Sequence, residues 1–198
     1  MRSFEEMKYI VCVEEVQSPT SSEWQCYFYR TARLGLRHLM VSDLQGGYAH
    51  WLNDPDVCRY NSHHRFLQSV EGLRTYVENT IDSRSMLVFA VVELASKRHI
   101  GNISLQNINY VDRNAEIAFL FGEKDCWGKG YANEAAEIII EHAFKELGLH
   151  RIYMGTSDDN IRMQHLALRL GFREEGRRQE AQFKRGEWHD IIEYGLLQ

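Results

Sequence analysis

The feature that most constrains this chain is a pair of glycines directly before a long amphipathic segment. Apolar residues recur at helical spacing over residues 132–147, and Gly148 follows as a C-terminal helix cap. The preceding residues 115–121 (AEIAFLF) are β-rich, and Gly128 and Gly130 lie between the two segments. The sequence therefore predicts a strand, a tight turn and a long helix.

The turn before this helix has the chemistry of an anion site. Glycine lets the backbone approach a ligand closely, and a helix N-terminus offers unpaired N–H groups and positive potential. Lys124 and Lys129 could add charge for a diphosphate. Turn geometry alone would explain the glycines equally well. A P-loop pattern is absent, and so is the third glycine of a dinucleotide fingerprint, so any phosphate turn here is of another kind.

The other predicted elements alternate between helices and strands. They indicate a mixed α/β (α+β) domain around one partly antiparallel sheet. The expected order is a strand at 31–37, a helix from Asp43 to about Leu52, a helix at 69–82, strands at 86–94, 99–109 and 115–121, the long helix, a strand at 151–156, a helix at 161–170, and strands at 172–180 and 190–197 joined through Arg185 and Gly186.

The first thirty residues differ from the rest. Residues 8–16 (KYIVCVEEV) and 24–29 (WQCYFY) are strand-like, and a turn containing Pro19 separates them. We predict an N-terminal hairpin extension at residues 1–30 and one main domain at residues 31–198.

Composition and charge limit the kinds of partner that this chain is expected to bind. The 198-residue chain has a net charge of −5, whereas nucleic-acid-binding proteins usually carry a basic excess, so no nucleic acid is expected. None of the four cysteines forms a CxxC pair, so neither a metal site nor a redox dithiol is predicted. The N-terminus lacks the apolar run of a signal peptide, and no segment has the length of a membrane span. We expect a cytoplasmic protein without a membrane partner.

Two motifs resemble one family. Residues 125–132 (DCWGKGYA) resemble the pyrophosphate-binding loop Q/R-x-x-G-x-G/A of the GNAT acetyltransferases, with Asp125 where Gln or Arg is usual. Residues 160–176 resemble the family block N-x-x-S followed by GF-x-x-E-G, with Met163 in place of Ser. The order of elements from Thr31 to Leu197 also follows the family. The resemblance is closest to the branch of ribosomal-protein N-terminal, spermidine and amino-sugar acetyltransferases.

This resemblance implies a mostly antiparallel sheet with flanking helices and a V-shaped cleft between two splayed central strands. Acetyl-CoA would enter the cleft as co-substrate, and the backbone of residues 119–121 would pair with its pantetheine arm. A backbone N–H on this strand would polarise the thioester carbonyl. The implied cofactor-binding residues are Phe119, Leu120, Phe121, Trp127, Gly128, Lys129, Gly130, Tyr131, Ala132 and Asn160.

The resemblance also implies direct attack by the acceptor amine. No enzyme nucleophile is then needed, which argues against that role for Cys126. Glu116 is the candidate general base, although it could instead be a structural carboxylate. The family's frequent leaving-group acid, a tyrosine, is replaced here by Ala167.

Several residues have both a functional and a structural interpretation. Asn160 could contact the cofactor, cap its helix, or do both. Arg162 and Arg169 could reach the 3′-phosphate of CoA or belong to a solvated helix face. Tyr60, Trp127 and Trp188 could line the acceptor cleft or pack in the core.

The acceptor is the least determined feature. A loop with His63, His64 and Arg65 could wall the acceptor site and suits phosphate or sugar hydroxyls. We therefore expect a small-molecule amine acceptor, with an amino-sugar nucleotide slightly ahead of a peptide N-terminus or a polyamine. A non-catalytic acyl-CoA-binding regulator is an alternative. A homodimer is a further option that the sequence leaves open.

Overall fold

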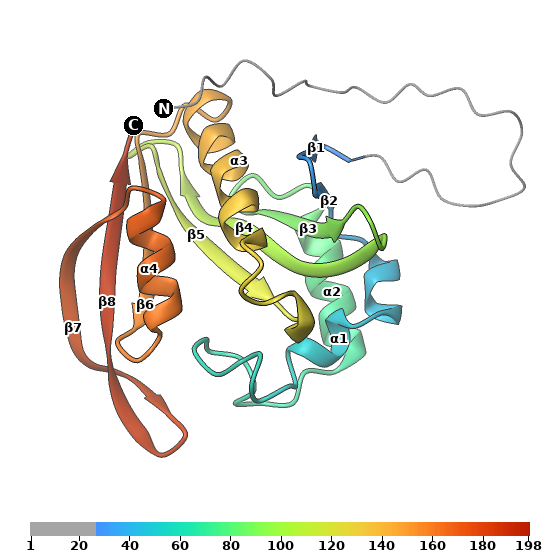
Figure 1. Cartoon of the computed structure of the whole chain (residues 1–198), viewed down its shortest axis with the longest axis horizontal. Coiled ribbons are helices and arrows are strands. Elements are labelled where there is room, and N and C mark those ends of the chain that lie inside the picture. The colour runs from blue at the N-terminus through green and yellow to red at the C-terminus, as the bar shows by residue number, and fades with distance from the viewer. Residues whose placement is uncertain (1–26) are drawn as a thin grey trace, which may run out of the picture.

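The computed structural model describes residues 27–198. The predicted N-terminal hairpin lies almost entirely outside the described residues, and its boundary at residue 30 stays a prediction. From residue 27 on, the chain forms one eight-stranded sheet with helices on both faces (Figure 1). The strands are β1 (Tyr29–Arg30), β2 (Leu34–His38), β3 (Leu87–Glu93), β4 (Arg98–Asn109), β5 (Asn114–Phe121), β6 (Arg151–Ser157), β7 (Arg173–Lys184) and β8 (Glu187–Leu197).

The strands are ordered β1-β2-β3-β4-β5-β6-β8-β7 across the sheet. Every neighbouring pair is antiparallel except β5 and β6, which are parallel because α3 (Tyr131–Lys145) connects them. The mixed, mostly antiparallel sheet predicted from the sequence is confirmed.

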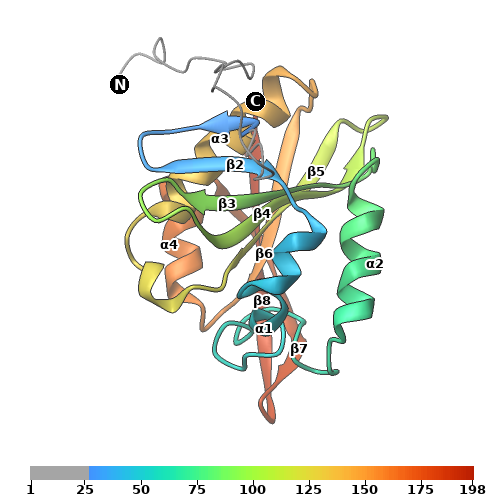
Figure 2. The same cartoon turned by 90° about the vertical axis from the view of Figure 1, so that its right-hand side faces the viewer.

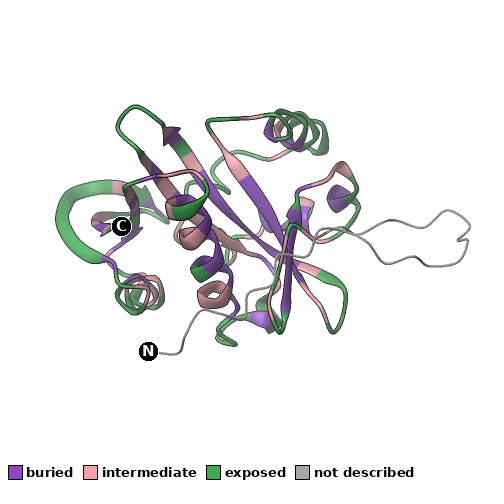
Figure 3. Cartoon of the chain, turned by 90° about the horizontal axis from the view of Figure 1, so that it is seen from above, coloured by how far each residue is buried: buried purple, intermediate pink, exposed green. Residues whose placement is uncertain are grey.

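Helices cover the two faces of the sheet separately. On β3, Phe89 and Val91 pack in one apolar cluster with α3, while Val88 and Ala90 pack in another with α1 (Tyr48–Trp51) and α2 (Val70–Thr80). This split follows from the alternation of side chains along a strand. Figure 2 shows α2 on one side of the sheet, and Figure 3 shows buried residues along the central strands. Among residues 27–198, no helix is sufficiently long and apolar to cross a membrane.

One predicted helix is wrong. Instead of a continuous helix from Asp43 to Leu52, the chain forms a 3-10 turn at Val41–Gln45 and the four-residue α1. The reason is tertiary: Asp43 is only 7% exposed, and its carboxylate binds the buried Arg37 guanidinium at 2.6 and 2.9 Å. The same carboxylate accepts a hydrogen bond from the Met40 N–H, which closes a tight turn.

The last two strands are longer than the sequence predicted. They continue to Lys184 and from Glu187, with only Arg185 and Gly186 between them. Both linking residues have positive φ, 54° and 86°. Such φ values belong to the two-residue hairpin turns that match the twist of the flanking strands.

Candidate functional site

The site is a cleft that opens where β5 and β6 separate. The two strands pair at three positions only: Asn114 with Arg151, Ala115 with Ile152, and Glu116 with Tyr153. Beyond the last pair, residues of both strands line a cleft of about 1840 Å³. The predicted V-shaped cleft between two splayed central strands is therefore present.

The glycine turn forms one end of this cleft. Gly128 and Gly130 have φ of 77° and 82°, in the left-handed region that favours glycine, and Gly130 is the N-cap residue of α3. The first intrahelical bond of α3 runs from the Glu134 N–H to the Gly130 carbonyl at 3.1 Å. The N–H groups of the preceding first turn therefore have no acceptor within the helix. This end of the cleft has the form of an anion site.

The cleft brings together all the predicted cofactor residues except Lys129. The residues of that set that line it are Phe119, Leu120, Phe121, Trp127, Gly128, Gly130, Tyr131, Ala132 and Asn160.

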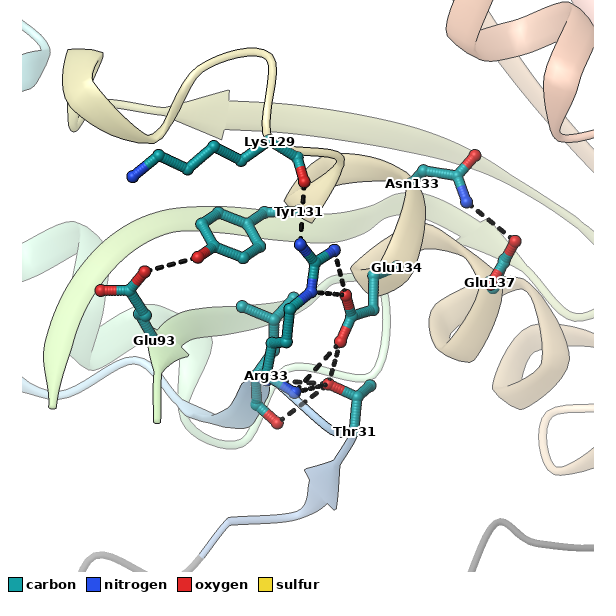
Figure 4. Close-up of polar contacts among 9 residues, drawn as sticks. Thr31, Arg33, Glu93, Lys129, Tyr131, Asn133, Glu134 and Glu137 are labelled. Atoms are coloured by element: carbon teal, nitrogen blue, oxygen red, sulfur yellow. Dashed lines mark hydrogen bonds and ion pairs between the residues drawn. The ribbon is translucent and has the colours of Figure 1, made fainter. Parts of the chain in front are cut away.

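Lys129 takes part in the turn through its carbonyl group. Arg33 donates from Nη1 to this carbonyl at 2.9 Å and from Nε to the Glu134 carboxylate at 2.7 Å (Figure 4). The guanidinium lies over the Tyr131 ring, 4.6 Å from its centroid, and the Tyr131 hydroxyl donates to Glu93. Sequence analysis missed Arg33, because it lies about a hundred positions before the turn and belongs to no motif there.

Two charged residues beside the turn are engaged elsewhere. The Lys124 ammonium lies 2.9 Å from Asp54 and 3.0 Å from Asp56, so its charge is shared by two carboxylates. Asp125, which replaces the usual Gln or Arg, accepts two hydrogen bonds of 3.0 Å from Arg98. Hydrogen bonding to Arg98 also lowers the pKa of the Asp125 carboxyl. Lys124 therefore adds less positive charge to a phosphate site than its sequence position indicated.

The backbone of residues 119–121 was expected to pair with the pantetheine arm, and the register of β5 contradicts this at Leu120. The register pairs Leu120 with Asn102, and the Gly122 N–H donates to the Ile100 carbonyl at 3.2 Å. Alternation along an antiparallel pair then directs the Leu120 backbone toward β4 and the Phe119 backbone toward the cleft. The predicted backbone pairing at Leu120 is thus unavailable. At Phe121, the carbonyl already accepts a 2.8 Å hydrogen bond from the Trp127 ring N–H.

Glu116 stands at the point where the cleft opens. Asn107 donates to its Oε2 at 3.2 Å. The other cleft-lining carboxylates each have a cationic or histidine neighbour within 4.0 Å: Asp56 has Lys124, Asp159 has His189 and Glu193 has Arg178. Among the described residues that line the cleft, Glu116 is the carboxylate without such a neighbour.

Tyr153 is a cleft residue that sequence analysis missed. It is the register partner of Glu116. Burial raises the pKa of its phenol, and the negative charge of Glu116 raises it further, so the hydroxyl stays protonated. In the sequence, Tyr153 is a single aromatic residue in a short predicted strand, and no motif marks it as part of a site.

The helix α4 (Ile161–Arg169) presents the second motif to the cleft. Asn160 caps it by accepting a hydrogen bond from the Met163 N–H at 3.4 Å, and its Nδ2 donates to the Thr156 hydroxyl. Arg162 and Arg169 are exposed and also line the cleft. Ala167 is fully buried.

The histidine loop is tied to the β7–β8 hairpin. Lys184, only 8% exposed, donates from Nζ to the carbonyls of Asn61 and His63 at 3.0 and 2.6 Å. Arg65 donates to the Phe183 carbonyl at 2.8 Å. Burial, followed by the nearby Lys184 charge, lowers the pKa of His63. Lys184 and Arg65 thus hold the loop against the hairpin, which leaves the Arg65 guanidinium less available to bind phosphate.

Of the remaining aromatic and histidine residues that were expected at the acceptor cleft, some line the cleft and others lie outside it. Tyr60 and Trp127 line the cleft, and His64 is exposed with a φ of 57°. Trp188 is 60% exposed and contacts the Phe183 ring at a centroid distance of 5.0 Å, outside the cleft lining.

The structure also bears on two other kinds of chemistry, a cysteine nucleophile and a metal site. Cys126 is a buried free thiol, and burial raises its pKa, which disfavours a nucleophilic thiolate. The structure also brings ligand atoms of Asp158, Asp159 and His189 within 4.8 Å of one another, a grouping without a sequence motif. Arg177 lies 3.8 Å from the Asp158 carboxylate, where its charge would oppose a cation.

Comparison with known proteins agrees with this geometry. The profile of the acetyltransferase (GNAT) domain matches residues 33–173. The chain is 36% identical over 97 residues to YdaF, a candidate ribosomal N-acetyltransferase of Bacillus subtilis, which is 49% of this chain and 52% of YdaF. It is 35% identical over 108 residues to the spermidine N(1)-acetyltransferase of Vibrio cholerae, which is 54% of this chain and 62% of that protein. The matched stretches thus span less than two thirds of each relative.

A solved structure extends the likeness over nearly the whole fold. The crystal structure of the Vibrio cholerae spermidine N-acetyltransferase with CoA and spermine superposes with a TM-score of 0.78 at 28% identity. The match covers 85% of this chain and 97% of that one. Together with the splayed strands and the glycine turn, these comparisons establish that the chain belongs to the GNAT acetyltransferase family.

Proposed function

We propose that this protein transfers the acetyl group of acetyl-CoA to a primary amine of a small acceptor, and that the acceptor is a polyamine of the spermidine type. The observation that carries the proposal is Glu116, which lies where β5 and β6 separate and is the one carboxylate of the described cleft lining without a cationic or histidine neighbour. An aliphatic amine is an ammonium at neutral pH. A carboxylate can both attract this ammonium and accept its proton.

In the proposed reaction, the diphosphate of acetyl-CoA lies on the glycine turn and the first-turn N–H groups of α3. Glu116 takes a proton from the acceptor ammonium, directly or through one water. The freed nitrogen attacks the thioester carbonyl carbon, and a C–N bond forms. The C–S bond then breaks, and the second proton of the nitrogen passes to the leaving thiolate, directly or through water, so that CoA leaves as the thiol. The Phe119 N–H at the free edge of β5 is a candidate donor to the developing oxyanion.

Charge favours a polyamine over an amino-sugar nucleotide. The Arg65 guanidinium, which suggested phosphate binding, donates to the β7–β8 hairpin, and burial lowers the pKa of His63, which disfavours its cationic form. The spermidine N-acetyltransferase of Vibrio cholerae is similar in both sequence and structure, and its solved complex contains CoA and spermine. The amino-sugar preference gains no support from this relative or from YdaF.

The test is CoA-thiol release with a panel of amines. Spermidine and spermine should be turned over faster than UDP-amino sugars and than peptides that begin with Ala or Ser. Efficient turnover of peptides alone would reassign the acceptor to a protein N-terminus. Absence of turnover, with acetyl-CoA still raising the melting temperature, would indicate the non-catalytic regulator instead.

A further inference from the structure

Arg33 contacts the glycine turn but is not among the residues that line the cleft. It immediately precedes β2, and its backbone is fixed by a hydrogen bond of 2.9 Å from the Leu94 N–H to its carbonyl. Its side chain crosses to the start of α3, where Nη2 lies 3.6 Å from the position of a Cβ built on Gly130. Arg33 thus links the start of β2 to the turn.

The first consequence concerns the direction of one peptide group. Arg33 holds the Lys129 carbonyl oxygen at 2.9 Å. In a trans peptide, the carbonyl and the following N–H point in opposite directions. The Gly130 N–H therefore points away from Arg33. Because Gly130 lines the cleft, this contact selects the orientation in which its N–H can meet an anion.

The second consequence is electrostatic. Glu134 lies in the first turn of α3, where its negative charge would oppose a bound diphosphate. Arg33 binds this carboxylate through Nε at 2.7 Å, and the Thr31 hydroxyl also donates to it. Figure 4 shows the Glu134 side chain turned toward Arg33 and Thr31. The pair neutralises the carboxylate at the sheet side of the helix.

The position of the guanidinium is itself constrained. It lies over the Tyr131 ring at 4.6 Å, and the Tyr131 hydroxyl donates to Glu93 at 2.5 Å. Tyr131 is only 8% exposed. A planar guanidinium can stack on this ring and donate to two acceptors simultaneously, which a lysine ammonium cannot reproduce.

We infer that Arg33 is a positioning residue for acetyl-CoA: it orients the Gly130 N–H toward the diphosphate and neutralises Glu134. The inference rests on the proposed use of acetyl-CoA and adds a residue outside the glycine turn to its binding. It also explains why the turn tolerates a glutamate in the first turn of its helix.

Direct CoA binding by calorimetry tests the inference without an acceptor. Arg33→Gln should weaken CoA binding about tenfold or more, the loss expected for a charge-assisted contact. Arg113→Gln is the matched control, because Arg113 donates from Nε to the Gly148 carbonyl at the opposite end of α3. Arg33→Lys should fall between Arg33→Gln and the wild type.

Acetyl-pantetheine, used as a second donor, distinguishes a positioning role of Arg33 from a general disturbance of the fold. Acetyl-pantetheine lacks the diphosphate, so its KM should be equal in Arg33→Gln and the wild type, whereas the KM for acetyl-CoA rises. The double variant Arg33→Gln, Glu134→Gln should recover at least about a third of the binding free energy for CoA that Arg33→Gln loses, because the carboxylate left without its partner is then gone. No recovery would overturn the electrostatic part of the inference.

These experiments distinguish failure of the proposed function from failure of the role inferred for Arg33. A wild-type protein that binds no CoA would refute the proposed function itself. A wild-type protein that binds CoA, with Arg33→Gln within about twofold of Arg113→Gln, would refute the role of Arg33 alone. Equal losses with acetyl-CoA and acetyl-pantetheine would also refute it, because that pattern indicates a disturbed fold.

Discussion

Glu116 and Tyr153 are register partners on the parallel strands β5 and β6, and they form the last pair before the strands separate. A carboxylate and a protonated phenol therefore face the widening cleft from opposite strands. Asn107 donates to the carboxylate from an irregular stretch of β4, where its own φ is 51°. This pairing places an acid–base candidate at the fork of the sheet.

Replacing Glu116 tests its proposed role as the base. Glu116→Gln should lower kcat about a hundredfold while CoA affinity changes little, because the side chain acts on the amine. The ratio of wild-type to variant rates should grow as the pH falls, since less of the amine is then deprotonated in solution. Glu137→Gln, an exposed carboxylate on α3, is the control. Equal rates at every pH would assign Glu116 a structural role.

Gly130→Val tests the glycine turn. A β-branched residue is strained at φ 82°, and its Cβ would lie 3.6 Å from the Arg33 guanidinium, so the turn should distort and CoA binding should be lost. Gly148→Val is a closely matched control. That glycine has a φ of 62° at the other end of α3, and a Cβ there lies 3.8 Å from Arg113, compared with 3.6 Å from Arg33 at Gly130. CoA affinity that falls equally in both variants would contradict the placement of the site.

Lys184→Met tests the histidine loop, which we expect to wall the acceptor site. Lys184 is a buried ammonium bonded to two carbonyls of the histidine loop, so its loss should loosen that loop. The KM for the amine should rise about tenfold, which corresponds to the loss of a charged hydrogen bond, whereas the KM for acetyl-CoA should not change. Lys145→Met on α3 should leave both constants unchanged. A rise in the acetyl-CoA KM alone would contradict this assignment.

Asp43→Asn tests the buried ion pair behind α1. Burial alone would raise the pKa of this carboxyl, but hydrogen bonds from Arg37 and His99 outweigh it and hold the pKa well below its usual range. Leaving Arg37 buried without its partner should cost about 3–5 kcal/mol of unfolding free energy. Denaturant titrations of the wild type and the variant measure this difference.

The same pair has a defined pH dependence. Because the folded pKa of Asp43 is depressed, its contribution is fully present above the unfolded value of about 3.9 and is lost as the pH falls through the folded pKa. The difference between wild type and Asp43→Asn should therefore be constant from about pH 8 to 5 and shrink in more acidic solution. A constant difference at lower pH would show that the pair does not titrate in this way.

Local sequence signals predicted much of the fold. The stripe of apolar residues in α3 and the apolar run in β3 each act through neighbouring residues along the chain. The same holds for Gly128 and Gly130, whose positive φ values are a property of the turn itself. Such features depend on backbone sterics and periodicity, which a single sequence contains.

What the sequence alone determined was the family, the glycine turn at the start of α3, and Glu116 as the carboxylate on the preceding strand. The tertiary structure alone decided which charges are available: Arg33 binds the turn, Lys124 is shared by two aspartates, and Lys184 holds the histidine loop. These pairs join residues that are far apart along the chain, and no local pattern specifies them. The strength and availability of a charge depend on its neighbours in space and on its burial, both of which are fixed only when the sheet assembles.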